Sequence, residues 1–414
     1  MLRILPLEDA QGFIARKAVQ LAEAVETVTP ILDAVRLRGD HALLEFARKF
    51  DGFEGTNLRV SESELSDAAS RVSPEFRTAL ETASKNIREY SRIQLPRETS
   101  VQFHDGRRLG QIVRPLDSMG AYIPAGRYPL PSTLLMTAIP AQVAGVQAIC
   151  VTSPRPSLEI LAAANFLGVS NVFRIGGAQA IAALAFGTET IPKVDRIVGP
   201  GSIYVTAAKK ALAGEVGIDF IAGPTEIVIV AEDANPKHVA ADMLAQAEHD
   251  VEASSILLTT SRVLAERVAQ EVARQLENLP TASVACESIC NHSAVILCPS
   301  VDAAVDASNR LAPEHLALYD EALLAKIRHA GSVFLGPSSP EAAGDYASGP
   351  NHVLPTAGAA RIRGGLSSAD FVKIISVQQL TSDGLARLAP SITTLARSEG
   401  LEAHARSVEV RLGK

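Results

Sequence analysis

The stretch between residues 118 and 340 alternates short apolar runs with segments of helical periodicity, and this alternation limits the fold more than any other feature. Apolar runs of strand length lie at 148–152, 171–175 and 196–198, and helical stretches at 157–167 and 179–186 separate them. Strands that are apolar on both faces are typical of parallel sheets covered by helices on either side. The pattern predicts an α/β fold whose first βαβ domain spans 118–217.

A second unit of the same build follows the first. Its expected elements are strands at 226–231, 254–259, 294–297 and 332–335, with helices starting at Pro236 and covering 262–276. We therefore expect two successive Rossmann-like open parallel-sheet domains, the second spanning 218–340. No residue-level repeat links the two units.

The flanking segments look helical. In 1–117, helices are expected at 30–38 and 41–50, and we interpret this segment as a helical N-terminal arm or lid. Start signals in it are the capping box of Ser61 and Glu64, and two N-caps that precede a proline, Thr29 and Ser73. After residue 340 the chain is glycine-rich and irregular, then helical at 382–398. We interpret 341–414 as an active-site loop and a C-terminal helical extension.

Composition excludes several classes of function. The net charge is −7 without long blocks of like charge, and aromatic residues make up only 4%, so no nucleic-acid partner is expected. Pro140 interrupts the most apolar window, 138–151, which is also too short to span a membrane. The first ten residues include Arg3 and Glu8 and lack the apolar core of a signal peptide. We expect a cytoplasmic enzyme without a membrane partner.

Two of the four cysteines have a spacing that also occurs in zinc sites. Cys286 and Cys290 are four residues apart and close to His292, as in a zinc knuckle. The segment 284–298, however, is expected to be a loop leading into a buried strand, where cysteine behaves as a small apolar residue. We favour this second interpretation.

A more specific metal signal lies at Gln246 and His249. These residues are three apart in a stretch of helix-forming residues, so both side chains project from one helical face and can meet one cation. Asp345 and His404 could complete a shell of nitrogen and oxygen ligands, which suits Zn²⁺. Taken singly, each of these residues is more often an ordinary solvated or hydrogen-bonded residue.

Glu314 and His315 supply proton-transfer groups. Histidine has an unperturbed pKa near neutrality and can act as a base, and the adjacent glutamate can activate a water molecule. The alternative is that the pair, which follows Pro313, merely closes a loop.

Taken together, these motifs resemble histidinol dehydrogenase. The resemblance rests on ordered segments that cover nearly the whole chain: 122–126, 131–136, 176–185, 198–201, 222–226, 246–249, 312–316, 344–349, 351–356 and 399–404. It implies an NAD⁺- and Zn²⁺-dependent enzyme that oxidises L-histidinol to L-histidine through histidinaldehyde, the last step of histidine biosynthesis. It assigns the base to His315 and the activation of water to Glu314.

The resemblance also implies where the cofactor binds, because no Gly-x-Gly-x-x-Gly motif follows an expected strand. The family's NAD contacts fall on Tyr122, Gln179 and Ser202. Position 202 departs from the family, which usually has Asn after Gly-Pro-Gly. The ordinary interpretations are strand packing for Tyr122, a helix-start cap for Gln179 and a turn hydroxyl for Ser202.

By the same resemblance the substrate contacts are Thr225, Gln246, His249, His315, Asp345, His352, Glu399 and His404. The metal ligands are Gln246, His249, Asp345 and His404, with one zinc ion per subunit. Glu399 and His404 come from the partner in a homodimer, so each active site is shared. His352, next to Asn351, could instead anchor a loop.

Three other functions remain open on sequence alone. A related dehydrogenase acting on another small polar alcohol, such as a sulfopropanediol, would require Arg or Lys for the sulfonate, whereas Glu314, His352 and Glu399 favour a cationic substrate. A zinc hydrolase could use Glu314 as its base, but the chain lacks a His-Glu-x-x-His helix. A non-catalytic relative would have lost a ligand or the base, and none is missing.

Overall fold

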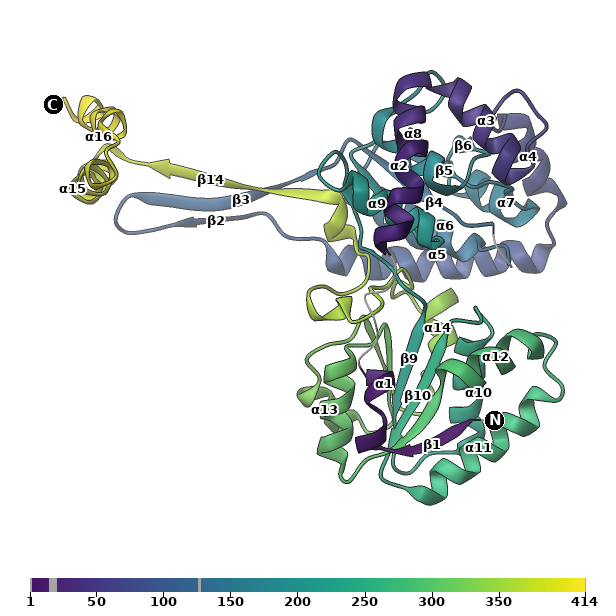
Figure 1. The fold of residues 1–414 in the computed structure, drawn as a ribbon. Coiled ribbons are helices and arrows are strands. Elements are labelled where there is room, and N and C mark those ends of the chain that lie inside the picture. The colour runs from purple at the N-terminus through teal and green to yellow at the C-terminus, as the bar shows by residue number, and fades with distance from the viewer. Residues whose placement is uncertain (1, 15–20, 126–127, 414) are drawn as a thin grey trace.

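The structure is a computed structural model that describes residues 2–14, 21–125 and 128–413. Two α/β bodies lie one above the other, and a thin arm extends from the upper body away from both (Figure 1). None of the described helices combines the length and the apolar character that a membrane span needs.

The upper body is built on a five-stranded parallel sheet with strand order β6-β5-β4-β7-β8. Its strands are β4 (Ser118–Tyr122), β5 (Ala148–Thr152), β6 (Asn171–Phe173), β7 (Arg196–Val198) and β8 (Gly217–Ile218). The chain adds strands to one side of β4 and then to the other, which is the Rossmann order. Ligands bind in such sheets beyond the carboxyl ends of the two strands at this reversal, here β4 and β7.

Helices cover both faces of this sheet, which explains its uniformly apolar strands. One core joins α2 (Leu21–Arg38), α3 (Asp40–Asp51), α8 (Gly177–Phe186) and α9 (Ile203–Leu212). The other joins α4 (Glu62–Arg71), α5 (Pro74–Gln94), α6 (Pro131–Ala144) and α7 (Leu158–Phe166). Most of the N-terminal helical segment therefore packs on the first sheet.

The lower body repeats this design around a six-stranded parallel sheet with order β1-β11-β10-β9-β12-β13. Its strands are β1 (Arg3–Pro6), β9 (Glu226–Val230), β10 (Ser254–Thr259), β11 (Ala294–Leu297), β12 (His315–Leu318) and β13 (Ser332–Leu335). On one face pack α10 (Pro236–Ala247), α11 (Arg262–Leu276) and α12 (Ala282–His292). On the other lie α13 (Val301–Leu311) and α1 (Gln11–Ile14).

The arm is a separate antiparallel sheet in which β3 (Arg107–Pro115) lies between β14 (Val372–Leu380) and β2 (Thr99–Gln102). Beyond it, at the tip, stand α15 (Ser382–Ser398) and α16 (Glu402–Glu409), which pack on each other (Figure 1). Neighbouring residues on opposite faces of β14, Ile374 and Ile375, are 54% and 44% exposed. The arm thus has apolar side chains on both faces that its own chain leaves uncovered.

The predicted α/β fold with two Rossmann-like sheets is confirmed, and several strands have the predicted bounds: β5, β7, β10, β11 and β13. Helix α15 and the caps at Ser61 and Ser73 are also as predicted.

Other local predictions are wrong. Thr29 does not cap a helix, because α2 begins upstream and runs through Pro30, and the Thr29 hydroxyl donates to the carbonyl oxygen of Val25 at 2.7 Å. The segment expected to be a loop at 284–298 is mostly helix α12. Segment 1–117 also holds three strands, β1, β2 and β3, which belong to the second sheet and to the arm.

Candidate active site

The predicted catalytic residues gather at the amino ends of β9 and β12, which are neighbours in the second sheet. His315 is the first residue of β12 and Glu314 precedes it, while Thr225 precedes β9. Helix α10 runs back against the strands, so its last turn brings Gln246 to the same edge. This edge lies next to the upper body, where α14 (Glu341–Tyr346) also sits (Figure 1).

His315 is 3% exposed and is surrounded by carboxylates. Its Nδ1 lies 3.5 Å from Glu341 Oε1 and 3.8 Å from Glu314 Oε2, and its Nε2 lies 3.7 Å from Asp345 Oδ1. Nδ1 also lies 3.3 Å from the carbonyl oxygen of Glu226, to which an Nδ1–H can donate. Nε2 is buried and has no hydrogen-bond partner among the described residues. The ring therefore directs an available nitrogen into the site.

The electrostatic setting shifts the pKa values of both predicted catalytic groups. Burial opposes the charged form of His315, but the three carboxylates outweigh burial and raise the pKa of His315 to about 10. Burial also raises the pKa of Glu314 to about 7, although the positive charge of His315 acts in the other direction. With these side chains alone, His315 is therefore protonated near neutral pH, whereas its unperturbed pKa predicted a largely neutral ring. Additional positive charge in the site would favour the neutral ring.

The proposed metal ligands from the body of the chain are close together. His249 Nε2 lies 3.8 Å from Asp345 Oδ2, and ligand atoms of His249, Glu341 and Asp345 all lie within 4.8 Å of one another. The Gln246 amide is fully buried and contacts the carboxylate of Glu341. Two carboxylates, an imidazole and an amide form a mixed nitrogen and oxygen set with excess negative charge, which fits a Zn²⁺ ion.

Glu341 is a site residue that the sequence analysis missed. Its carboxyl group is 2% exposed, and burial raises its pKa well above the ordinary value. It opens α14 four residues before Asp345, so both side chains lie on one face of that helix. This spacing was readable in the sequence once Asp345 was suspected as a ligand.

His352 has protein partners on both ring nitrogens. Nδ1 lies 2.8 Å from the carbonyl oxygen of Asp345, and Nε2 lies 3.2 Å from Thr133 Oγ1 on α6. Burial lowers the pKa of His352. These contacts favour the loop-anchor interpretation, in which His352 fixes the segment after α14 against the upper body.

Glu399 and His404 do not join the site of their own chain. Glu399 caps α15 and His404 lies on α16, both at the far end of the arm, and both are exposed (Figure 1). Within one chain the structure therefore assembles Gln246, His249 and Asp345 but leaves out the fourth predicted ligand.

The predicted cofactor contacts flank the carboxyl ends of β4 and β7. Tyr122 Oη accepts a hydrogen bond from Gly177 N at 3.1 Å, and burial raises the pKa of Tyr122 to about 12. The amide of Gln179 is 1% exposed and donates to Asp51 at 3.4 Å. Both polar groups are thus occupied by protein contacts. Ser202 is exposed at the start of α9, and its side chain makes no cap hydrogen bond, so the turn-hydroxyl interpretation is not observed.

A buried ion pair fixes the loop that leads to Ser202. Gly199 donates its N–H to Asp219 at 2.8 Å and accepts from Lys209 Nζ at 3.0 Å, while Lys209 and Asp219 pair with each other. Gly199 has φ +112°, and a Cβ there would collide with the carbonyl oxygen of Tyr122. The close approach of β7 to β4 at the crevice therefore requires glycine.

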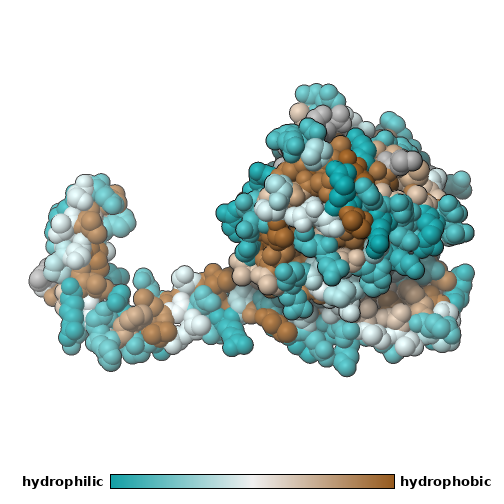
Figure 2. Space-filling view, turned by 90° about the horizontal axis from the view of Figure 1, so that it is seen from below, coloured by the Kyte–Doolittle hydropathy of each residue, from teal (hydrophilic) through white to brown (hydrophobic). Residues whose placement is uncertain are grey.

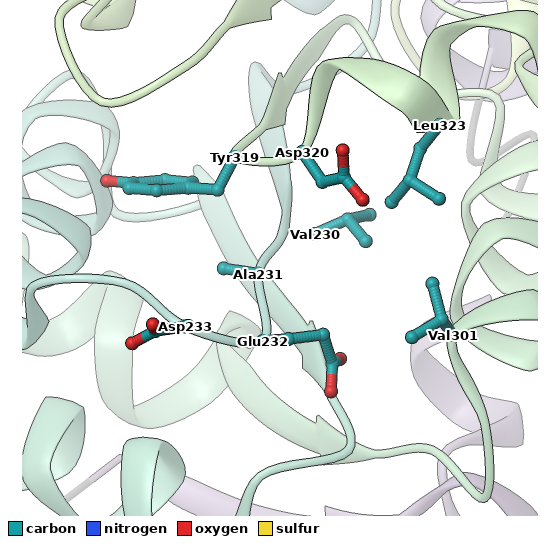
Figure 3. A pocket seen from close by; sticks show the side chains of 8 residues that line it. All are labelled: Val230, Ala231, Glu232, Asp233, Val301, Tyr319, Asp320 and Leu323. Carbon is teal, nitrogen blue, oxygen red and sulfur yellow. The ribbon is translucent and has the colours of Figure 1, made fainter.

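A cavity of about 220 Å³ lies at the opposite, carboxyl edge of the second sheet (Figure 3). Two of its three acidic side chains have partners: Glu232 accepts from Thr260 N at 2.9 Å, and Asp320 accepts from Ala322 N at 2.9 Å. In the second body the reactive groups thus lie at the amino ends of the strands, contrary to the general rule for open α/β sheets.

This fold and this site define an α/β dehydrogenase with two Rossmann-like domains. The family model for histidinol dehydrogenase matches residues 14–412, and the chain belongs to this family.

Individual relatives agree with this assignment. A histidinol dehydrogenase of Methanothermobacter thermautotrophicus is 46% identical over 96% of each chain. One of Geobacter metallireducens is 48% identical over 97% of this chain and 94% of its own. The crystal structure of histidinol dehydrogenase from Elizabethkingia anophelis superimposes with a TM-score of 0.94 at 39% identity, covering 100% of this chain and 98% of that one.

Proposed function

We propose that the protein oxidises L-histidinol to L-histidine with two molecules of NAD⁺, through histidinaldehyde, in a site that holds one Zn²⁺ ion. The observation that carries the proposal is the buried pair of Glu314 and His315 beside the donor group of His249, Glu341 and Asp345. Proton removal from a bound alcohol requires a base next to the cation ligands, and His315 Nε2, which has no hydrogen-bond partner among the described residues and lies 3.7 Å from Asp345 Oδ1, has this position.

Each group has one task in this scheme. His315 Nε2 takes the hydroxyl proton of histidinol while the carbinol hydride passes to NAD⁺. Glu314 takes a proton from the water that adds to the aldehyde, and the hydrate gives its hydride to a second NAD⁺. Gln246, His249, Asp345 and a His404 would hold the metal. When bound, the ion supplies positive charge that opposes protonation of His315 and holds the imidazole and amine nitrogens of the substrate.

We also propose a homodimer in which the arm of each subunit completes the site of the other. Uncovered apolar residues on the arm and its tip helices support this: Ile374, Ile375 and Val377, with Leu395, Leu401 and Val410. Figure 2 shows the arm reaching away from the body, with apolar patches among hydrophilic ones. His404 and Glu399 would thereby reach a donor group that they cannot reach in their own chain. A cytoplasmic location fits four cysteines without a disulfide among the described residues.

Metal removal tests the proposal directly. We expect histidinol and NAD⁺ to give two NADH per substrate molecule, activity to disappear after chelation, and Zn²⁺ to restore it. Absorbance of NADH measures all three. A chelated enzyme that keeps its full rate would refute the metal part, and oxidation of a different alcohol in preference to histidinol would refute the substrate.

Glu314→Gln should separate the two oxidations. Because glutamine cannot take a proton from water, we expect NADH formation from supplied histidinaldehyde to fall about 100-fold more than the histidinol half-reaction. In the unmodified enzyme the aldehyde step should speed up as the pH rises through about 7, since Glu314 has its pKa raised to that value and acts as the carboxylate. The variant should lack this rise. An equal loss of both steps would assign Glu314 a different role.

A further inference from the structure

Thr225 lies between the water-activating residue and a proposed metal ligand. Its hydroxyl donates to Glu314 Oε2 at 2.6 Å, and Gln246 Nε2 donates to the same hydroxyl at 2.7 Å. Glu314 Oε2 also accepts the backbone N–H of Glu226 at 2.9 Å. Glu314, Thr225 and Gln246 thus form one chain of hydrogen bonds, with Glu314 and Gln246 buried and Thr225 partly buried, that ends at the metal donor group.

When Glu314 is ionised, as its proposed role as a base requires, the number of available protons fixes the direction of this chain. A carboxylate can only accept, so Glu314 Oε2 takes the only hydroxyl proton of Thr225. Thr225 Oγ1 must then accept from Gln246, which can donate only through its amide nitrogen. The amide oxygen of Gln246 is consequently turned to the opposite side, toward Glu341 and its neighbours His249 and Asp345, where it faces only acceptors until a cation binds among them.

We propose that Thr225 is a positioning residue that orients the amide of Gln246 so that its oxygen, the atom able to bind a cation, faces the metal donor group. The inference rests on the proposed zinc site and adds to it a link between that site and Glu314. It gives Thr225 a task besides the expected substrate contact, since its hydroxyl proton is donated to Glu314.

The amide can also be turned the other way, with a different consequence. The amide nitrogen then donates to the carboxylate of Glu341, with a distance of 3.2 Å to Oε2. The amide oxygen accepts the hydroxyl proton of Thr225, with 2.7 Å between the two oxygens. In that arrangement Glu314 loses the hydroxyl donor and a donor NH₂ group faces the cation ligands. A cation repels this NH₂ group and attracts the amide oxygen. Without the Thr225 hydroxyl, nothing on the Glu314 side opposes the second arrangement.

Substitutions at Thr225 test the inference through metal affinity. Thr225→Val keeps the shape and removes the hydroxyl, and we expect its Zn²⁺ affinity to fall about 10- to 100-fold, as for other residues that orient a ligand. The Zn²⁺ affinity of Thr225→Ala, which removes the hydroxyl without adding the second γ-methyl group of valine, should fall by a similar factor. Thr225→Ser keeps the hydroxyl, and its Zn²⁺ affinity should stay within a factor of about three of the parent. Affinity is measured on the full-length apo protein by competition with a chromogenic chelator, with circular dichroism to verify folding.

The outcomes separate this inference from the proposed metal site. Weak binding by Thr225→Val and Thr225→Ala together with retained binding by Thr225→Ser supports it. Parent-like binding by the two hydroxyl-free variants overturns it, and so does equal weakening of all three. Gln246→Ala provides the reference: if it is weakened while Thr225→Val is not, the zinc site stands and only the positioning role fails. If Gln246→Ala binds Zn²⁺ like the parent, the ligand set is wrong and the inference falls with it.

Discussion

Replacing His315 by asparagine is expected to lower kcat for histidinol oxidation by about 10²- to 10⁴-fold, the usual contribution of a positioned acid–base group. An asparagine amide can still donate to the carbonyl oxygen of Glu226, which holds the ring through Nδ1. It has no counterpart of Nε2, the buried nitrogen without a hydrogen bond in the described part of the chain. The substitution therefore removes the proposed base and leaves the strand pairing of β12 intact.

Two measurements make this result specific. Zn²⁺ content should stay at the parent level, because His315 is not among the proposed ligands. The matched control is His292→Asn on α12, where the ring pairs with exposed Glu252 at 3.6 Å and kcat should not change. A His315→Asn enzyme that retains more than about a tenth of the parent kcat would show that another group removes the proton.

The two sheets were predictable because their signals are local. A parallel strand covered on both faces is a short apolar run, and such runs gave the exact bounds of β5, β10 and β13. The arm was not predicted, because β14 has exposed residues along nearly its whole length and therefore lacks an apolar pattern. It is stabilised by pairing with β3, which is far away in the chain. One local signal was present: Asp105 and Gly106, with φ +88° at the glycine, form the turn that joins β2 to β3.

The candidate site was predictable where spacing or resemblance pointed to it. Three-residue spacing suggested that Gln246 and His249 share a helical face; the structure ends α10 at Ala247, yet both residues lie near Glu341. Glu341 was missed because its burial depends on the docking of α14 against the second sheet, which no local pattern reveals. The shift of the His315 pKa to about 10 was missed for the same reason, since it arises from carboxylates on separate elements.

Two inactive variants should restore activity when they form mixed dimers. His315→Asn damages the body of a subunit and His404→Ala damages its arm. If each site combines the body of one subunit with the arm of the other, a mixed dimer has one site with both defects and one site with none. Random assortment places half of the subunits in mixed dimers, so activity should recover to about a quarter of the parent level.

The experiment requires subunit exchange, by co-expression or by refolding of a mixture, followed by the NADH assay. The matched control combines His315→Asn with Gln246→Ala, two body defects that leave one lesion in every site of a mixed dimer and therefore give no recovery. In the proposed dimer the pair His315→Asn and His404→Ala must recover activity, because Glu399 and His404 lie beyond a sheet that holds them away from Gln246 of their own chain. Absence of recovery in verified mixed dimers would mean that each chain completes its own site by folding the arm back.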